Sequence, residues 1–381
     1  MTGMLTEHSA GAGNFTEAPG ATGADTDTAH SAHSARPGHP AGAVPDPSAV
    51  AGAGTPGGSA PRAAETTVCT DDGARLAVSV LAPLAPASGT TVVLAHGWAA
   101  ARRVWGGVAD RLIRRGHRVV AADLRGHGAS TPGGAPFSVP RLGADLAAVL
   151  EHTGARDAVL VGHSGGGFAA LSYATDEASA PAARALRGLV LLGTAAHDQD
   201  TPDSEVRMMG SALFSRALAR PALGRRLLAQ TMGKGVDRRA LEVNRQMFAA
   251  TSPRVRADAF RSSRGMDLRA ALAAVHTPAV VLAGDGDRVI APHLGHAVAE
   301  ALPRARFTRL PGAGHMLPLE RPDEIVSAVE SVLGDGTVAA ADEDARPAGS
   351  TATAASAASA ASTTTPATVT TAASSTSSAS G

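Results

Sequence analysis

Short runs of apolar residues, each bounded by turn-forming residues, recur along the middle of the chain. Several of them are rich in Val and Leu throughout and do not alternate with polar residues, which is typical of strands buried on both faces of a parallel sheet. We therefore predict strands at 76–81, 91–95, 118–122, 158–162, 189–192, 279–283 and 306–310.

Segments with helical spacing of apolar residues lie between these runs. They are 104–115, 139–152, 168–176, 294–302 and 323–333. Strands that alternate with helices indicate βαβ units, in which helices cover both faces of one sheet. The predicted fold is an α/β three-layer sandwich with a mostly parallel sheet.

The alternation breaks once, between about 197 and 272, where the apolar pattern is helical and no strand is evident. This stretch either extends the outer helical layer or forms a helical cap. We favour a cap at approximately 198–272, because a normal crossover needs far fewer residues.

The two ends of the chain differ in composition from its middle. Residues 1–62 are mostly small or polar, and 336–381 are dominated by Ala, Ser and Thr. Such segments bury too little apolar surface to offset the entropy lost on ordering, so both are predicted to be disordered, low-complexity tails. The folded domain is predicted to span 63–335.

Composition excludes several classes of partner. The 34 basic residues balance the 34 acidic ones, so no nucleic-acid or anionic-membrane partner is expected. Cys69 is the single cysteine, which excludes an intrachain disulfide, and it lacks a motif that would make it a nucleophile. No secretory signal is evident and no run of 18 apolar residues occurs, so we expect a cytoplasmic protein with no integral membrane association.

The strongest chemical signal is Gly162-His163-Ser164-Gly165-Gly166, which follows an apolar run and precedes a helical one. A G-x-S-x-G sequence in this context is typical of a nucleophile elbow, whose tight turn requires small residues. Ser164 would lie at a helix N-terminus, where N–H groups favour negative charge. A phosphate-binding loop is the alternative, but no Lys-Ser or Lys-Thr follows the glycines.

A second signal is Leu94-Ala95-His96-Gly97-Trp98, at the end of an earlier predicted strand. The backbone N–H groups of Trp98 and Gly165 could together form an oxyanion hole. The alternative is an ordinary turn with a buried tryptophan.

Acidic and histidine-containing loops follow the last two predicted strands. In Gly284-Asp285-Gly286-Asp287, one carboxylate could orient a histidine, or both could bind a metal, although no further ligands are placed to complete a metal site. His315, flanked by small residues, follows the last predicted strand. A chain order of Ser, Asp, His is the order of the α/β-hydrolase triad.

Residues from about 65 to 335 resemble the α/β-hydrolase family, on these motifs and on Asp123-Leu124-Arg125-Gly126-His127-Gly128-Ala129-Ser130. The last of them resembles the D-x-R-G-x-G-x-S loop of capped members, which implies a structural role and no catalytic part for His127. The resemblance implies Asp287 as the acid, a variable position for Asp285, and Glu320 as an anchor for the last helix.

The resemblance implies a carboxylic-ester hydrolase with Ser164 as nucleophile, His315 as base and no cofactor or metal. Related dehalogenases and epoxide hydrolases carry Asp at the nucleophile position, so the chain is more similar to esterases, lipases and cofactor-free haloperoxidases. C–C bond hydrolysis, acyl transfer to an alcohol, or a non-catalytic ligand-binding scaffold remain the alternatives.

The predicted cap bears on the substrate. Its residues 198–264 hold four of the eight methionines (Met208, Met209, Met232 and Met247), which suit an adaptable apolar pocket or simply the packing of cap helices. Residues 198–264 carry 13 Lys and Arg against 7 Asp and Glu, a net charge of +6. We expect a small or medium apolar ester, with a solvated basic face or attraction of an anionic substrate as the two interpretations of the charge.

Overall fold

The computed structural model describes residues 63–343, apart from 88, 177–181 and 184. The tail predicted at 1–62 lies outside the described residues, as does most of the one predicted at 336–381. Helix α13 (Pro322–Glu343) continues past position 335, where the sequence places the end of the domain.

One eight-stranded sheet organises the described part of the chain, in the order β1-β2-β4-β3-β5-β6-β7-β8. Neighbours from β4 to β8 pair in parallel, whereas β2 is antiparallel to both β1 and β4. The predicted mostly parallel α/β sheet is thereby confirmed. The strands are β1 (Ala63–Cys69), β2 (Arg75–Leu81), β3 (Thr91–Ala95), β4 (Arg118–Ala122), β5 (Val159–His163), β6 (Gly188–Leu192), β7 (Ala279–Gly284) and β8 (Ala305–Leu310).

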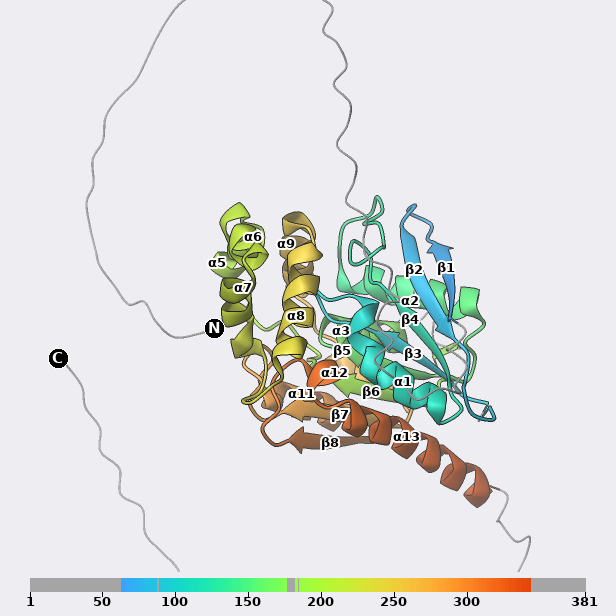
Figure 1. Ribbon diagram of the computed structural model, residues 1–381. Coiled ribbons are helices and arrows are strands. Elements are labelled where there is room, and N and C mark those ends of the chain that lie inside the picture. Colours follow the sequence, from blue (N-terminus) through green and yellow to red (C-terminus); the bar gives the residue numbers. More distant parts are fainter. Residues whose placement is uncertain (1–62, 88, 177–181, 184, 344–381) are drawn as a thin grey trace, which may run out of the picture. The chain divides into compact units, whose positions relative to one another are not determined.

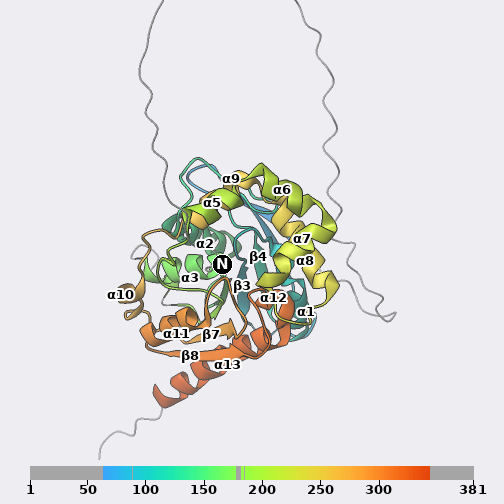
Figure 2. The ribbon, with the colours of Figure 1, turned by 90° about the vertical axis from the view of Figure 1, so that its left-hand side faces the viewer.

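Helices cover both faces of this sheet (Figures 1 and 2). Successive strand residues point to opposite faces, so Val93 packs in one core and Val92 and Leu94 in the other. The first core is closed by α2 (Val139–Thr153), α3 (Gly165–Thr175) and α11 (Pro292–Ala301). The second is closed by α13 and α1 (Gly106–Arg114). The short helix η2 (Arg102–Trp105) comes directly before α1.

Between β6 and β7 the described chain forms helices and adds no strand to the sheet. Figure 1 shows α5, α6, α7, α8 and α9 gathered on the side toward which the arrow of β8 points. They lie within the segment in which the sequence predicts a cap. The bounds are α5 (Asp203–Met209), α6 (Ala212–Ala219), α7 (Pro221–Leu228), η3 (Ala229–Thr231), α8 (Arg238–Ala250), α9 (Pro253–Arg261) and α10 (Arg269–Leu272). No helix among the described residues is long and apolar enough to cross a membrane.

A buried ion pair fixes the loop that follows β4. The guanidinium of Arg125 is inaccessible to solvent and donates to both carboxylate oxygens of Asp145 on α2, at 2.6 and 2.7 Å. It also donates to Asp72 in the β1–β2 turn, at 2.8 Å. Three segments distant in sequence are therefore joined at one side chain.

Replacing Asp145 with alanine should destabilise the fold by about 3–5 kcal/mol, because it leaves a buried charge short of a partner. The matched control is Asp110→Ala, which removes an exposed ion pair with Arg114 and should cost less than about 1 kcal/mol. Urea unfolding of both variants at pH 7 measures the two costs. Equal losses of unfolding free energy in the two variants would show that the buried ion pair stabilises the fold no more than the exposed one.

Candidate active site

Ser164 occupies a strained turn between β5 and α3. Its φ is +52°, in the left-handed region that non-glycine residues rarely adopt. The turn also requires close approach of backbone: a Cβ at Gly162 would lie 2.6 Å from the carbonyl oxygen of Gly166, and one at Gly166 would lie 2.2 Å from that of Ala95. These contacts explain why both positions are glycine, and they have the geometry of a nucleophile elbow.

The end of strand β6 holds this turn. The Ser164 N–H donates to the carbonyl of Leu192 at 2.9 Å, and the hydroxyl of Thr194 donates to the carbonyl of Ser164 at 3.0 Å. Thr194 is fully buried. The sequence pattern does not single it out, although its place directly after an apolar strand is a signal of the kind used for the other loops. The backbone of the serine is thus fixed on both sides.

His315 and Asp287 form a buried pair. The imidazole Nδ1 lies 2.8 Å from Oδ2 of Asp287, whose side chain is inaccessible to solvent. The other oxygen of Asp287 accepts the N–H groups of Val289 and Ile290 at 2.8 and 2.9 Å. A carboxylate so held accepts a hydrogen bond from Nδ1–H, which leaves Nε2 of His315 unprotonated and able to take a proton.

The same strand end brings this pair next to Ser164. A Cβ at Gly193 would lie 3.1 Å from Oδ2 of Asp287 and 3.3 Å from Nδ1 of His315. Gly193 directly follows Leu192, the residue whose carbonyl accepts the Ser164 N–H. The imidazole of His315 also lies 4.9 Å, between ring centroids, from that of His163, the neighbour of Ser164. Residues expected to act together are therefore brought to one end of the sheet.

Asp285, the competing acid, has a different position. It is exposed, and its carboxylate accepts the N–H of Gly312 at 2.8 Å. It therefore supports the loop that carries His315, while Asp287 contacts the imidazole.

The loop after β3 packs directly against the serine turn. A Cβ at Gly97 would lie 2.9 Å from Cβ of Ser164, and one at Gly165 would lie 2.2 Å from Nε1 of the Trp98 indole. The indole also contacts the rings of Phe168 and of Phe260 on α9, with centroids 5.2 and 5.4 Å away. Helix α9 thus contributes an aromatic wall beside the serine.

The two backbone N–H groups expected to form the oxyanion hole belong to Trp98 and Gly165, the residues that meet at this contact. Within the described part of the chain, neither the Trp98 N–H nor the Gly165 N–H has a protein acceptor. The indole N–H of Trp98 is likewise buried without a partner. Free donors at the N-terminus of α3 suit an oxygen atom that acquires negative charge.

Two buried histidines orient the peptide groups on either side of Trp98. Nδ1 of His96 lies 2.7 Å from the carbonyl of Gly97, in the same peptide unit as the Trp98 N–H, and its Nε2 accepts the Leu124 N–H. Nε2 of His127 accepts the Ala99 N–H at 3.0 Å, and its Nδ1 donates to the carbonyl of Arg125. Each ring accepts a backbone hydrogen bond on Nε2, which therefore carries no proton, so both rings are neutral. The sequence pattern does not reveal this role of His96.

Burial lowers the pKa of His127 to about 3 and lowers that of His96 as well. The folded protein then binds fewer protons than the unfolded chain between about pH 3 and 6.5. The contribution of these neutral histidines to the free energy of unfolding is therefore fully present above pH 6.5. It is lost as the pH falls through this window, by on the order of a few kcal/mol. Urea unfolding of the wild type at pH 7 and pH 4.5 should show the loss. A His127→Gln variant should lose less, and an equal loss in the two proteins would contradict this origin.

His163 holds the backbone of His315. Its Nε2 donates to the carbonyl of His315 at 2.8 Å, and its Nδ1 is buried without a partner. Desolvation and the nearby His315 hold the pKa of His163 well below its usual value. A neutral His163 adds no positive charge beside the pair.

Glu320 does not anchor the last helix, contrary to the role that the resemblance implies. It lies on the short helix α12 (Leu317–Glu320), and its carboxylate accepts backbone N–H groups of Gly233, Gly314 and Met316. Two of these three groups flank His315.

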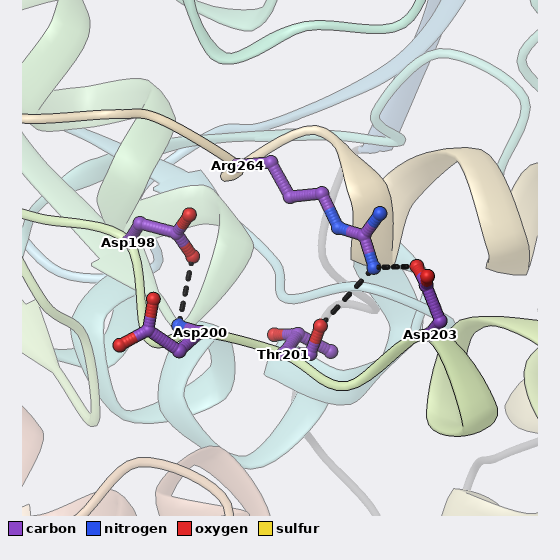
Figure 3. A pocket seen from close by; sticks show the side chains of 5 residues that line it. All are labelled: Asp198, Asp200, Thr201, Asp203 and Arg264. Atoms are coloured by element: carbon purple, nitrogen blue, oxygen red, sulfur yellow. Dashed lines mark hydrogen bonds and ion pairs between the residues drawn. The ribbon is translucent and has the colours of Figure 1, made fainter.

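A separate cavity of about 380 Å³ opens where the chain leaves β6 for the helices (Figure 3), lined by Asp198, Asp200, Thr201, Asp203 and Arg264. Three of its four charged side chains are engaged locally: Asp198 accepts the N–H groups of Asp200 and Gly265, and Arg264 donates to Asp203 at 2.6 Å. It contains neither Ser164 nor His315, and we assign it no chemistry.

Comparison with known proteins shows the family to which this fold belongs. The family model described as alpha/beta hydrolase fold matches residues 90–322. A pimeloyl-[acyl-carrier protein] methyl ester esterase of Xanthomonas campestris is 32% identical over 248 residues, which are 63% of this chain and 94% of that protein. A non-heme haloperoxidase of Rhodococcus erythropolis is 38% identical over 99 residues, 26% of this chain and 36% of that protein.

Solved structures give the same result. An esterase from a Rhodococcus species is similar with a TM-score of 0.60 and 27% identity, covering 71% of this chain and 98% of that one. A thermophilic esterase from Thermogutta terrifontis has a TM-score of 0.59 and 26% identity, covering 72% and 99%. With the family model matching more than half of its length, this chain belongs to the α/β-hydrolase fold family.

Proposed function

We propose that the protein hydrolyses carboxylic esters, with Ser164 as nucleophile, His315 as general base and Asp287 as the acid that orients it. The observation that carries the proposal is the buried 2.8 Å contact between His315 and Asp287 beside a serine in a strained turn. Three of the four similar proteins named above are esterases, which supports the same chemistry.

The proposed reaction has two steps. His315 takes the hydroxyl proton of Ser164 on Nε2 while Oγ attacks the ester carbonyl, and the resulting oxyanion is held by the N–H groups of Trp98 and Gly165. Collapse of this intermediate breaks the ester C–O bond, and the proton on His315 leaves with the alcohol. Water, deprotonated by His315, then attacks the acyl-enzyme and releases the acid and Ser164.

The substrate that we propose is a small or medium apolar ester bound beneath a helical cap. The indole of Trp98 lies against Gly165, one of the two proposed oxyanion donors, and packs on the rings of Phe168 and Phe260. Aromatic side chains of this kind bind the apolar part of a ligand. We also propose a cytoplasmic location, which a single cysteine, unable to form an intrachain disulfide, supports.

A series of p-nitrophenyl esters with acyl chains of two to about twelve carbons tests this proposal. We expect turnover of several members, with kcat/KM rising with chain length and then falling where the acyl group outgrows the pocket. Absence of turnover across the whole series, in protein shown to be folded, would contradict ester hydrolysis.

An ester that bears a negative charge is a second candidate, because many cap cations are exposed. They include Arg207, Arg216, Arg220, Arg226, Lys234, Arg238 and Arg239. Salt should then lower kcat/KM for a carboxylate-bearing ester and leave an uncharged ester of equal length unaffected, since screening acts on separated charges. Equal salt dependence for the two esters, measured from 10 to 500 mM NaCl, would contradict attraction by the cap.

A further inference from the structure

The loop that carries His315 is held by groups outside it, two of which, Thr231 and His163, are far away in the sequence. The N–H of His315 donates to the carbonyl of Thr231 at 2.9 Å, and its carbonyl accepts Nε2 of His163 at 2.8 Å. The N–H groups of Gly314 and Met316, on either side, donate to the carboxylate of Glu320 at 2.8 and 3.0 Å. The position of the His315 backbone thus depends on side chains and a carbonyl group outside its loop.

Glu320 binds a third N–H group, which belongs to the helical segment between β6 and β7. Its Oε2 accepts the Gly233 N–H at 2.8 Å as well as that of Gly314. One carboxylate oxygen therefore joins the residue before His315 to the chain just after η3. Hydrogen bonds to an ionised carboxylate are stronger than those between neutral groups, so this junction is firm.

The two backbones at the junction are in close contact. A Cβ at Gly314 would lie 2.4 Å from the backbone nitrogen of Gly233, and one at Gly233 would lie 2.1 Å from the carbonyl oxygen of Gly312. Only glycine at positions 233 and 314 permits this approach. The segment 231–233 and the His315 loop consequently pack as one unit.

The helices of the predicted cap connect to the same unit. Thr231, whose carbonyl accepts the His315 N–H, also receives a hydrogen bond on its hydroxyl from Asn244. Asn244 is buried on α8. A displacement of α8 would therefore move the segment that contains Thr231 and Gly233, and with it the loop that carries His315.

We propose that Glu320 is a positioning residue that holds His315 for its role as base and couples it to the cap segment 231–233. The inference rests on the proposed function, in which His315 must meet Ser164 and the substrate with its imidazole correctly aimed. Misplacement of a catalytic group by about 1 Å can cost about 100-fold in rate. Glu320 itself does not touch the reacting atoms.

The test is turnover per active site, with sites counted by end-point labelling with a fluorophosphonate. In Glu320→Gln an amide nitrogen faces a backbone N–H, so the three contacts cannot all persist. We expect turnover per labelled site to fall about 10- to 100-fold. A purely structural role would lower the number of sites and leave turnover per site unchanged. Glu300→Gln, the same change on the exposed face of α11, should remain within about twofold of the wild type.

The coupling to the cap is tested by a double-mutant cycle with Gly233→Ala, whose methyl group would separate segment 231–233 from the His315 loop. If both changes break one junction, the double variant should be no slower per site than the slower single variant. Losses that multiply would overturn the coupling. If Glu320→Gln yields no labelled sites, Glu320→Asp, with both oxygens on a shorter stem, takes its place with a loss of about tenfold expected.

The outcomes separate this inference from the function on which it rests. Absence of labelling at Ser164 in the wild type would contradict the proposed function. Labelling and turnover in the wild type, with wild-type turnover per site in Glu320→Gln, would overturn only the positioning role.

Discussion

Replacement of Ser164 by alanine is expected to lower ester turnover by about 10⁴- to 10⁶-fold. The hydroxyl is the proposed attacking group, and the neighbouring side chains cannot replace it: His163 is buried and donates to the carbonyl of His315. The residual rate would come from substrate binding and from the oxyanion donors Trp98 and Gly165. Steady-state kinetics with the best p-nitrophenyl ester measures the loss.

Ser172→Ala is the matched control, because it removes a buried hydroxyl from the same helix, α3, without touching the serine turn. Its kcat/KM should stay within about threefold of the wild-type value. Wild-type-like turnover in Ser164→Ala would refute the nucleophile.

Replacement of Asp287 by asparagine is expected to lower kcat by about 10⁴-fold. An amide at this position no longer stabilises the imidazolium, and it favours the tautomer of His315 whose Nε2 bears the proton, which cannot act as a base. The fold should survive, because the Asn oxygen can still accept the N–H groups of Val289 and Ile290, which Oδ1 of Asp287 accepts now.

Asp285→Asn provides the comparison within the same loop. The carboxylate of Asp285 is exposed and accepts only the Gly312 N–H among the interactions described for it, so a loss of less than about tenfold is expected. Kinetics at saturating ester, with both variants at equal concentration, measures the two effects. A severe loss in Asp285→Asn together with a mild one in Asp287→Asn would exchange their assignments.

The sheet could be predicted from sequence because its central strands are apolar on both faces. All seven predicted strands are present, with ends that differ by about one residue. Strand β1 was missed for a physical reason: it lies at the sheet edge and only Val68 of its seven residues is buried. Its stability comes from pairing with β2, which its own pattern does not encode.

The candidate catalytic residues could be proposed because each follows a strand that ends at the same edge of a parallel sheet. The groups that hold these catalytic residues in place could not be predicted from the sequence. Glu320 binds the N–H of Gly233, 87 positions away, and His127 binds that of Ala99, 28 positions away. Hydrogen bonds to distant backbone leave no periodic pattern, since every residue type except proline supplies the N–H group.

The net charge of the predicted cap gives a second example, because composition does not show which of its cations are exposed. The count of +6 treats every cation as a surface group, yet Arg256 and Arg245 are buried. Arg256 donates to the carbonyls of Met209, Phe248 and Thr251 and so links three helices of the predicted cap. Only the packing distinguishes such a structural cation from one that is available to a ligand.

The most direct test of the proposed nucleophile is covalent labelling of the wild-type protein with a fluorophosphonate, followed by peptide mapping by mass spectrometry. We expect one adduct per chain, on Ser164, and none in Ser164→Ala or after heat denaturation, because only the folded site activates this hydroxyl. No adduct in folded protein, or an adduct on another residue, would contradict the assignment of Ser164 as the nucleophile.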